Sequence, residues 1–515
     1  MLRVITILLF VLLQLAVIVV LTVYGSRFSF WIEYGLTLAS ILVVFHVVGD
    51  RNGAAFRILW IILILSFPVF GGLLYLLFNY QSSTARFKRD LQQAQEKAEK
   101  YFIKNGTEAD LLKNAPIPNS EFRTPNSGFR TPDSLVQYLK NFAGFPVYSH
   151  TRTAYLSPGE VKRDRLLEVL RGAEKYIFLE YFSIAEGEFW SAVLEILKEK
   201  AAAGLDVRVI YDDAGCLALL PRNYPKQLAK FGIRAVVFNP FRPFLTAKQN
   251  NRDHRKIAVA DGKIAVTGGI NLADEYVNAR RKYGHWKDAA VLAEGEAAWS
   301  FTLMFLQMWD VCAKTDEDYG AYYPWGAEPC PIADGGLVQP YADSPLSPER
   351  VGEHIYLKIA YNAKKYLYIN TPYLIIDNSM MTALTLAAKS GVDVRVVTPH
   401  HPDKFYVHMV TRSNYLELIR AGVKVYEYTD GFIHSKTFLC DGETATVGSV
   451  NLDYRSLYLS FECGACLYGT AAVEELHQDY MDTLERCRLL TEADCKTGRI
   501  KRVVAALFRL LSPLL

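Results

Sequence analysis

The stretch Asn251–Tyr276, NRDHRKIAVADGKIAVTGGINLADEY, decides the fold of this 515-residue chain. It places His254 two residues before Lys256, with Asp261 and Asn271 further along. The runs on either side of the Asp-Gly pair are apolar and β-prone, which predicts a β-hairpin closed by a tight turn. Side chains two apart on a strand point to one face, so an imidazole and an ammonium should project together. That pair suits a phosphate group.

The same four residue types recur at the same spacing in a second stretch, GFIHSKTFLCDGETATVGSVNLD, which begins at Gly431. Its histidine lies 180 residues after the first one. A single H-x-K on a strand is commonly a solvated surface, but two copies in register are hard to explain in that way. The repeated residues are His434, Lys436, Asp441 and Asn451.

The duplication extends beyond the two hairpins. A GxDVRV motif at 204–209 returns at 391–396, which is 187 residues later. In the first half we expect helices at 166–173 and 189–203, with strands at 176–182 and 204–210. The second half repeats this order at 366–373, 380–389 and 391–397, and FGIRAVV (231–237) corresponds to AGVKVYE (421–427). The pattern predicts two duplicated α/β domains with mixed sheets flanked by helices, at 136–325 and 326–490.

The paired motifs contain the groups needed to cleave a phosphodiester. One neutral histidine can attack phosphorus while the other, protonated, donates to the leaving alkoxide. Two ammonium groups can supply positive charge, and two amides hydrogen-bond donors, as the phosphorus becomes five-coordinate, so we expect neither a metal nor another cofactor. The groups for these tasks are His254, His434, Lys256, Lys436, Asn271 and Asn451. We interpret Asp261 and Asp441, at the hairpin turns, as structural supports rather than proton carriers.

Metal catalysis is the competing explanation for phosphoryl chemistry. The adjacent Asp212 and Asp213 follow a predicted strand, but such pairs more often cap a helix or turn. The isolated CxxC at Cys463 and Cys466 has no second pair beside it, and free cysteines are commonly small buried apolar groups. Eight scattered cysteines are typical of a reducing compartment, and a net charge of only +3 argues against nucleic acid as the main partner.

Both ends of the chain favour membrane contact. Apolar runs at 4–24, 34–48 and 58–78 predict a transmembrane anchor of two or three helices within 1–80. Basic residues at 86–89 favour a cytoplasmic location for the domains after the anchor. Residues 81–135 combine a charged helix at 87–102 with a linker that repeats FRTP. Residues 491–515 predict a basic amphipathic helix, which either lies on an anionic membrane or packs on the catalytic core.

Taken together, these motifs resemble the phospholipase D superfamily with its paired HKD motifs, and more narrowly the bacterial cardiolipin synthases. NRDHRKIAVADG, TGGINLADEY, YEYTDGFIHSK and NLDYRSLYLSFE carry the resemblance, which runs over nearly the whole chain. It implies that the two halves face each other across one cleft. It also implies that His254 is the nucleophile and His434 the acid and base. Asp288, 34 residues after His254, and Glu462, 28 after His434, match carboxylates that orient these histidines in the superfamily.

The resemblance implies a bacterial cell-membrane enzyme that transfers a phosphatidyl group between two phosphatidylglycerol molecules through a phosphohistidine. The products would be cardiolipin and glycerol. Hydrolytic phospholipase D activity, transfer to another alcohol, and a non-catalytic membrane scaffold remain as alternatives. The oligomeric state is left open by the sequence.

Overall fold

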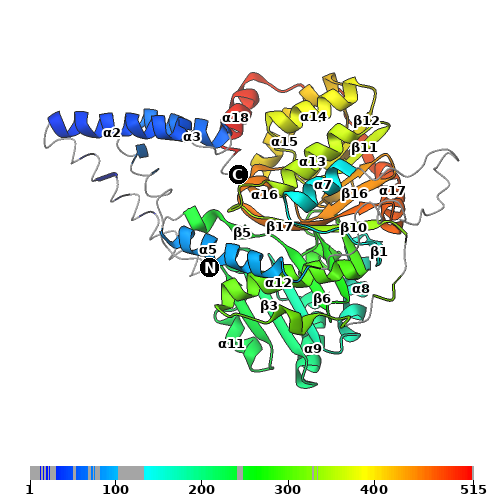
Figure 1. The fold of residues 1–515 in the computed structure, drawn as a ribbon. Coiled ribbons are helices and arrows are strands. Elements are labelled where there is room, and N and C mark those ends of the chain that lie inside the picture. Colours follow the sequence, from blue (N-terminus) through cyan, green and yellow to red (C-terminus); the bar gives the residue numbers. More distant parts are fainter. Residues whose placement is uncertain are drawn as a thin grey trace.

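Two β-sheets of the same design form the body of the protein in the computed structural model (Figure 1). The first sheet contains, in spatial order, β1 (Thr151–Leu156), β9 (Ala290–Gly295), β7 (Ile264–Gly268), β6 (Lys256–Ala260), β2 (Tyr176–Tyr181), β3 (Asp206–Asp212) and β4 (Arg234–Phe238). The second contains β10 (Leu337–Asp343), β17 (Ser460–Tyr468), β16 (Thr444–Gly448), β15 (Thr437–Cys440), β11 (Tyr366–Asn370), β12 (Asp393–Pro399), β13 (Lys424–Tyr428) and β18 (Cys487–Leu489). Apart from β18, the two orders correspond strand for strand, so the predicted duplication of an α/β domain is confirmed.

The structure describes the body of the chain with few gaps. The described residues are 30–49, 54–67, 82–102, 133–240, 247–326, 330–332 and 335–512, with single positions at 12, 16, 19, 20, 23, 71, 72 and 75.

Each sheet is mixed, as expected. In the first, β2, β3 and β4 are parallel, whereas β6, β7, β9 and β1 are antiparallel. The parallel strand β2, YIFLEY, is buried along its whole length because both faces of the sheet are covered. The GxDVRV motif marks the entry to β3 and β12. Its glycines, Gly204 and Gly391, have φ of +92° and +95°, a conformation that L side chains rarely adopt.

Helices form three layers around the sheets. The outer face of the first sheet is covered by α8 (Gly159–Arg171), α9 (Glu188–Ala202) and α11 (Tyr224–Ala229). The outer face of the second is covered by α13 (Val351–Asn362), α14 (Asn378–Lys389) and α15 (Phe405–Arg420). Between the sheets lie α12 (Glu296–Ala313) and α17 (Ala471–Leu484), in one apolar cluster with Phe178 of β2 and Tyr368 of β11. The two halves therefore share a core.

Two helices that precede the first sheet pack on this body. The first, α5 (Ser82–Ala98), is the charged helix expected at 87–102; it buries Leu91 against α12, and Lys97 pairs with Asp310 at 3.0 Å. The second, α7 (Asp133–Asn141), packs on α13 and joins the apolar cluster of the second half. The repeated FRTP segments at 122–132 lie outside the described residues.

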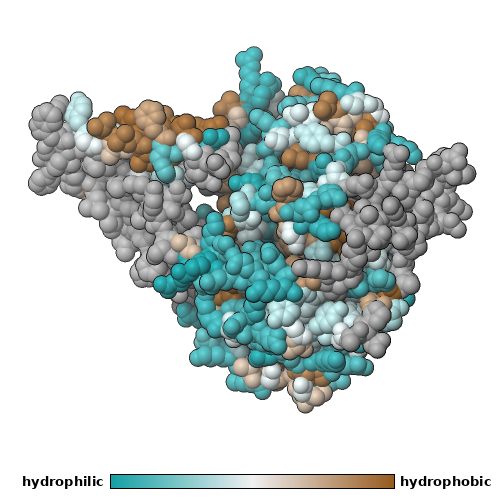
Figure 2. Space-filling model, in the orientation of Figure 1, coloured by the Kyte–Doolittle hydropathy of each residue, from teal (hydrophilic) through white to brown (hydrophobic). Residues whose placement is uncertain are grey.

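The apolar N-terminal runs are described in part. α2 (Phe30–Gly49) covers the predicted middle run, and α3 (Ala54–Ser66) covers the start of the third. Figure 2 shows apolar residues gathered along both helices. Within the described residues, no helix meets the length and apolarity needed to cross a bilayer. Most of the run at 4–24 lies outside the described residues. The transmembrane anchor therefore stays a prediction.

Candidate active site

The two predicted hairpins are confirmed, but the histidines lie just outside them. β6 and β7 are antiparallel around a turn at Asp261, and β15 and β16 around a turn at Asp441. We expected His254 and Lys256 to lie two apart on one strand; instead β6 begins only at Lys256, and His254 lies in the link from β5 (Arg252–Asp253). The expectation was wrong because the segment before each hairpin leaves its own sheet and pairs with the opposite half.

The segment before the first hairpin pairs with the second half. β5 runs parallel to β17, and the His254 amide donates to the Phe461 carbonyl at 2.9 Å. This pairing places His254 Nδ1 2.9 Å from both carboxylate oxygens of Glu462, the next residue of β17. A histidine of one half is thus oriented by a carboxylate of the other.

The second motif repeats this arrangement in reverse. β14 (Gly431–Ile433) pairs in parallel with β8 (His285–Lys287) of the first half. The His434 amide donates to the Lys287 carbonyl at 2.6 Å, and His434 Nδ1 lies 2.6 Å from Asp288 Oδ2. Both predicted carboxylates therefore meet a catalytic-motif histidine, and each does so across the boundary between the halves.

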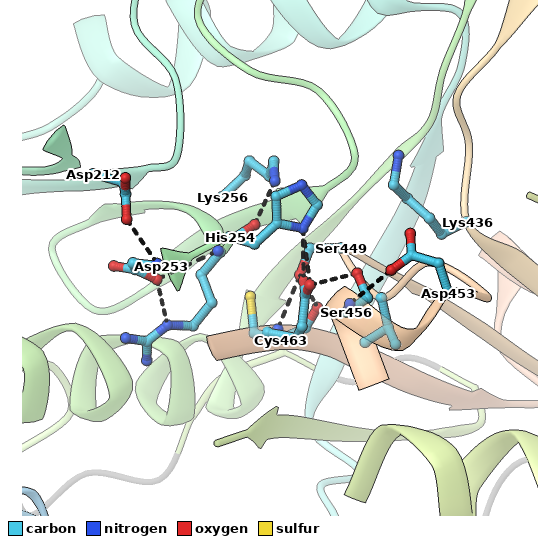
Figure 3. Close-up of polar contacts among 12 residues, drawn as sticks. Asp212, Asp253, His254, Lys256, Lys436, Ser449, Asp453, Ser456 and Cys463 are labelled. Carbon is cyan, nitrogen blue, oxygen red and sulfur yellow. Dashed lines mark hydrogen bonds and ion pairs between the residues drawn. The ribbon is translucent and has the colours of Figure 1, made fainter. Parts of the chain in front are cut away.

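Both carboxylates are fully buried, and each has a further contact that the sequence analysis missed. Glu462 accepts hydrogen bonds from Ser449 and, at 2.7 Å, from Ser456 (Figure 3). At the position equivalent to Ser449 the first half has Gly269, where an added Cβ would lie 2.2 Å from Asp288 Oδ1. The signal was available in the sequence, because these two residues stand at the same place in the duplicated TGG and VGS segments.

The two lysines bring positive charge to both histidines. Each donates from Nζ to the carbonyl of the histidine in its own motif, and Lys436 Nζ also lies 2.8 Å from His434 Nδ1. Figure 3 shows Lys256 and Lys436 on either side of His254. Burial lowers the pKa of Lys256 to about 8 and that of Lys436 to about 7. An anion that enters the site would therefore favour both protonated ammonium groups.

The electrostatics keep His254 neutral. Burial, then the charges of Lys256 and Lys436, hold the pKa of His254 well below its usual value. Burial also raises the pKa of Glu462 to about 7, against the opposing effect of Lys256. A neutral imidazole that donates from Nδ1 to Glu462 leaves the Nε2 lone pair available for attack.

The environment of His434 differs from that of His254. Burial and then Lys436 lower the pKa of His434 to about 4, although Asp288 raises it. Burial raises the pKa of Asp288, but His434 and Lys436 outweigh this effect and bring it below its usual value. Asp288 is thus an ionised partner that favours a proton on His434 once an anionic substrate offsets the lysines.

The two asparagines lie buried beside the hairpins. Asn271 Oδ1 accepts from the Ser183 amide at 3.1 Å, an orientation that leaves the NH₂ group of Asn271 as a donor. Asn451 is also buried, and its Oδ1 has no hydrogen-bond partner within the described part of the chain. One amide is therefore fixed by the protein, whereas the other keeps an unused acceptor.

The turn aspartates face away from the histidines and bind backbone. Asp261 accepts from the amides of residues 174, 175 and 176 at 2.7–2.8 Å. Asp441 accepts from the amides of residues 364, 365 and 366 at 2.8–2.9 Å. Both have φ of +54°. Each carboxylate thus ties its hairpin turn to the start of the neighbouring strand.

No group of three or more metal-ligating side chains occurs within the described residues. Asp212 accepts from the Ala214 and Gly215 amides as the N-cap of α10 (Asp213–Cys216), and it pairs with Arg252 at 3.3 Å. Cys463 and Cys466 are buried in β17 without a disulfide. The paired motifs supply groups for acid–base and nucleophilic chemistry on a phosphate.

Comparison with known protein families shows which family contains these paired motifs. A family model described as "Cardiolipin synthase, PLD-like domain" matches residues 166–309 and 356–484, so each match contains one hairpin and its histidine. The chain belongs to this family. A second model, described as "Phospholipase_D-nuclease N-terminal", matches residues 38–78.

Relatives agree with this membership over almost the full length. An uncharacterized protein of Streptococcus mutans is 41% identical over 92% of this chain and 99% of its own. A cardiolipin synthase of Geobacillus sp. (strain WCH70) is 34% identical over 93% of each chain. The crystal structure of phosphatidylserine synthase from Haemophilus influenzae Rd KW20 matches with a TM-score of 0.58 and 15% identity, over 75% of this chain and 100% of that one, and shows the shared fold.

Proposed function

We propose that this family member is a cardiolipin synthase that transfers a phosphatidyl group from one phosphatidylglycerol to another. The observation that carries the proposal is the crossed pairing, His254 with Glu462 and His434 with Asp288, which joins both halves into a single buried site. Two histidines with different partners divide nucleophile and acid between them, and that division is what a two-step transfer requires.

In the first step, Nε2 of His254 attacks the phosphorus of phosphatidylglycerol. A P–N bond forms as the P–O bond to glycerol breaks, and His434 donates its proton to the departing alkoxide. Lys256, Lys436 and the amide of Asn271 stabilise the charge on the non-bridging oxygens, which is greatest in the five-coordinate transition state. Glycerol leaves, and the phosphatidyl group remains on His254.

In the second step, the terminal hydroxyl of another phosphatidylglycerol attacks the phosphohistidine. His434, now neutral, accepts the hydroxyl proton, and the P–N bond breaks as the new P–O bond forms. Glu462 and Asp288 keep the two imidazoles oriented throughout because each holds an Nδ1 atom. The product is cardiolipin, and one phosphodiester is exchanged for another without an external energy source.

The same proposal includes a membrane location. Both substrates are lipids, the family model for the N-terminal segment covers residues 38–78, and the curated cardiolipin synthases match along the same length. We assign residues 1–80 to a multi-pass anchor that holds the catalytic body at the cytoplasmic face. The catalytic body would then meet its lipid substrates at the bilayer surface and would not need to capture them from solution.

Incubation of the purified full-length protein with phosphatidylglycerol labelled in its glycerol headgroup tests the proposed function. We expect cardiolipin and free labelled glycerol in equal amounts. Phosphatidic acid as the main product would indicate hydrolysis instead, and product formed only with an added alcohol would indicate another acceptor. Release of no glycerol by folded protein would contradict an enzymatic role.

A further inference from the structure

The C-terminal helix α18 (Arg499–Leu510) presents an apolar stripe to its surroundings. Ile500, Val503 and Leu507 fall at i, i+3 and i+7, so they share one side of the helix, and they are 82, 71 and 57% exposed. A soluble helix usually turns such a stripe toward a core. On α18 the stripe is left largely uncovered by the described residues.

All the charged residues of α18 are basic. Its sequence, RIKRVVAALFRL, contains four cationic residues and no acidic one: Arg499, Lys501, Arg502 and Arg509. A second protein surface would need a matching acidic rim around an apolar groove. A bilayer that contains anionic lipid offers both features at once, with apolar chains below the plane of the headgroup phosphates.

A series of contacts connects α18, through Phe508, with the candidate active site. Phe508 packs on Tyr406 at a ring distance of 6.2 Å, within a cluster that also includes Tyr373. Tyr373 in turn lies 6.4 Å from Phe432, and Phe432 lies 5.9 Å from His434. The helix is therefore linked to the catalytic-motif histidine through the apolar cluster of Ile375, Val407 and Val410 and the rings of Tyr373 and Phe432.

The apolar N-terminal helices meet the body on the same side. Phe56 of α3 packs on Tyr454 and Tyr458 of α16 (Tyr454–Tyr458), at ring distances of 6.2 and 6.0 Å. Tyr454 belongs to the same cluster as Phe508. In the view of Figure 1, α18 and α3 both lie in the upper part of the molecule, and α11 lies at the bottom.

We propose that α18 is an interfacial helix that docks the opening of the active site on an anionic lipid surface. The exposed stripe, extended by Phe405 of α15, enters the acyl boundary, and the basic residues contact headgroup phosphates. This contact is separate from the N-terminal anchor. It would hold the site at the depth where a lipid phosphodiester lies. The proposal concerns membrane contact rather than the reaction, so it stands or fails independently of the proposed function.

Hydrogen–deuterium exchange of the full-length protein provides the test. The protein is placed in nanodiscs of phosphatidylcholine alone, in nanodiscs that also contain phosphatidylglycerol, and in detergent micelles. We expect amides 499–510 to exchange most slowly in the phosphatidylglycerol nanodiscs. Amides 188–202 of α9, which lies at the opposite end of the molecule from α18 (Figure 1), serve as an internal reference that should not respond to lipid.

A charge-reversal variant sharpens the test. Lys501→Glu with Arg502→Glu should lower the affinity of α18 for the anionic bilayer by at least about tenfold. Each basic residue near an anionic surface strengthens binding, and each glutamate is repelled by it. The matched control is Lys226→Glu with Lys230→Glu, which makes the same change at exposed positions on and just after α11. It should retain the protection of α18.

Several outcomes would overturn the proposal. The first is equal exchange of α18 in all three environments. The second is protection by phosphatidylglycerol that the charge-reversal variant keeps. The third is protection that appears in detergent as protein concentration rises, which would assign the stripe to a second copy of the chain.

Discussion

The two histidine motifs match in sequence but lie in different surroundings. His254 has one aromatic neighbour, Phe182 at a ring distance of 5.2 Å, and several polar ones: its carboxylate, Glu462, accepts from two serine hydroxyls, and Asp253 beside it pairs with the buried Arg255. His434 lies among aromatic rings, with Tyr276 at 5.4 Å and Trp286 at 5.2 Å, and its carboxylate touches a glycine. A duplicated motif has thus become two chemically distinct groups, and the difference is made by neighbours rather than by the motif.

Replacement of each histidine should have the largest effect on activity, and the two replacements should block different steps. His254→Ala removes the nucleophile and should form no phosphoryl-enzyme from any substrate. His434→Ala removes only the acid and base, a contribution of about 10²–10⁴-fold. It should still trap an acid-labile phosphohistidine from an ester with a good leaving group such as nitrophenol, while failing on phosphatidylglycerol.

The trapped adduct decides the assignment. An adduct in His254→Ala and none in His434→Ala would reverse the two roles while keeping the two-histidine scheme. Normal lipid turnover by either folded variant would end that scheme.

Replacement of the two orienting carboxylates should have the next largest effect, and the loss of kcat/KM should differ between them. Asp288 is held ionised, so Asp288→Asn removes a full charge beside His434 and should lower kcat/KM by about 10²-fold or more. The pKa of Glu462 is raised to about 7, so its charge is already partly lost at neutral pH. Glu462→Gln should therefore cost only about tenfold.

Steady-state kinetics of both variants at pH 7 measure this difference, with circular dichroism as the control for folding. A larger loss in Glu462→Gln than in Asp288→Asn would contradict the electrostatic distinction between the two sites.

The pH profile should separate the two lysines. An ammonium is charged below its pKa, so kcat/KM should fall as pH rises through about 7, where Lys436 loses its proton, and more steeply above about 8, where Lys256 does. The fall should approach about tenfold per pH unit for each group. On the acidic side, kcat/KM should fall as His254 becomes protonated, which gives a bell-shaped curve.

Lys436→Arg should delay the first fall, since an arginine stays charged throughout this range. Lys256→Arg should leave the first fall in place and remove the steeper part. A rate that rises monotonically from pH 5 to 9 with intact protein would argue against both assignments.

Much of this comparison could be predicted from the chain, because its signals are local. Each Asp-Gly turn and each copy of GxDVRV lies within a short window, and each predicted the correct element: a β-hairpin at the turn and a strand at the motif. The crossed pairing was not visible there. Asp288 and Glu462 follow the histidines of their own halves in sequence, yet β5 and β14 pair with the opposite half. Such a relation is set by the packing of the two sheets around a shared core.

The histidines themselves were placed on strands for a related reason. Alternation predicts side-chain direction only where a segment belongs to the adjacent hairpin. The residues just before Lys256 pair with β17 of the second half instead of continuing strand β6. The alternation of side chains along β6 therefore does not extend to His254. The duplicated TGG and VGS segments show that Gly269 and Ser449 differ, but the carboxylate that each residue contacts depends on the packing of strands distant in sequence.

The smallest expected effect on activity concerns the turn aspartates, which differ in exposure rather than in contacts. Asp261 is 7% exposed and Asp441 is half-buried, although each accepts three backbone amides. The hydrogen bonds of Asp261 are part-buried or buried, so Asp261→Ala should lower the free energy of unfolding by about 1–3 kcal/mol. Two of the three hydrogen bonds of Asp441 are exposed, so water can replace much of the bonding that Asp441→Ala removes. Thermal denaturation measures the loss of stability in both variants.

Asn tolerates the positive φ and keeps one acceptor, so Asp261→Asn is the matched control. Below the melting temperature, all three variants should keep kcat within about twofold, since neither carboxylate contacts a histidine. A hundredfold loss of kcat in Asp261→Asn at unchanged melting temperature would instead make Asp261 part of the reaction.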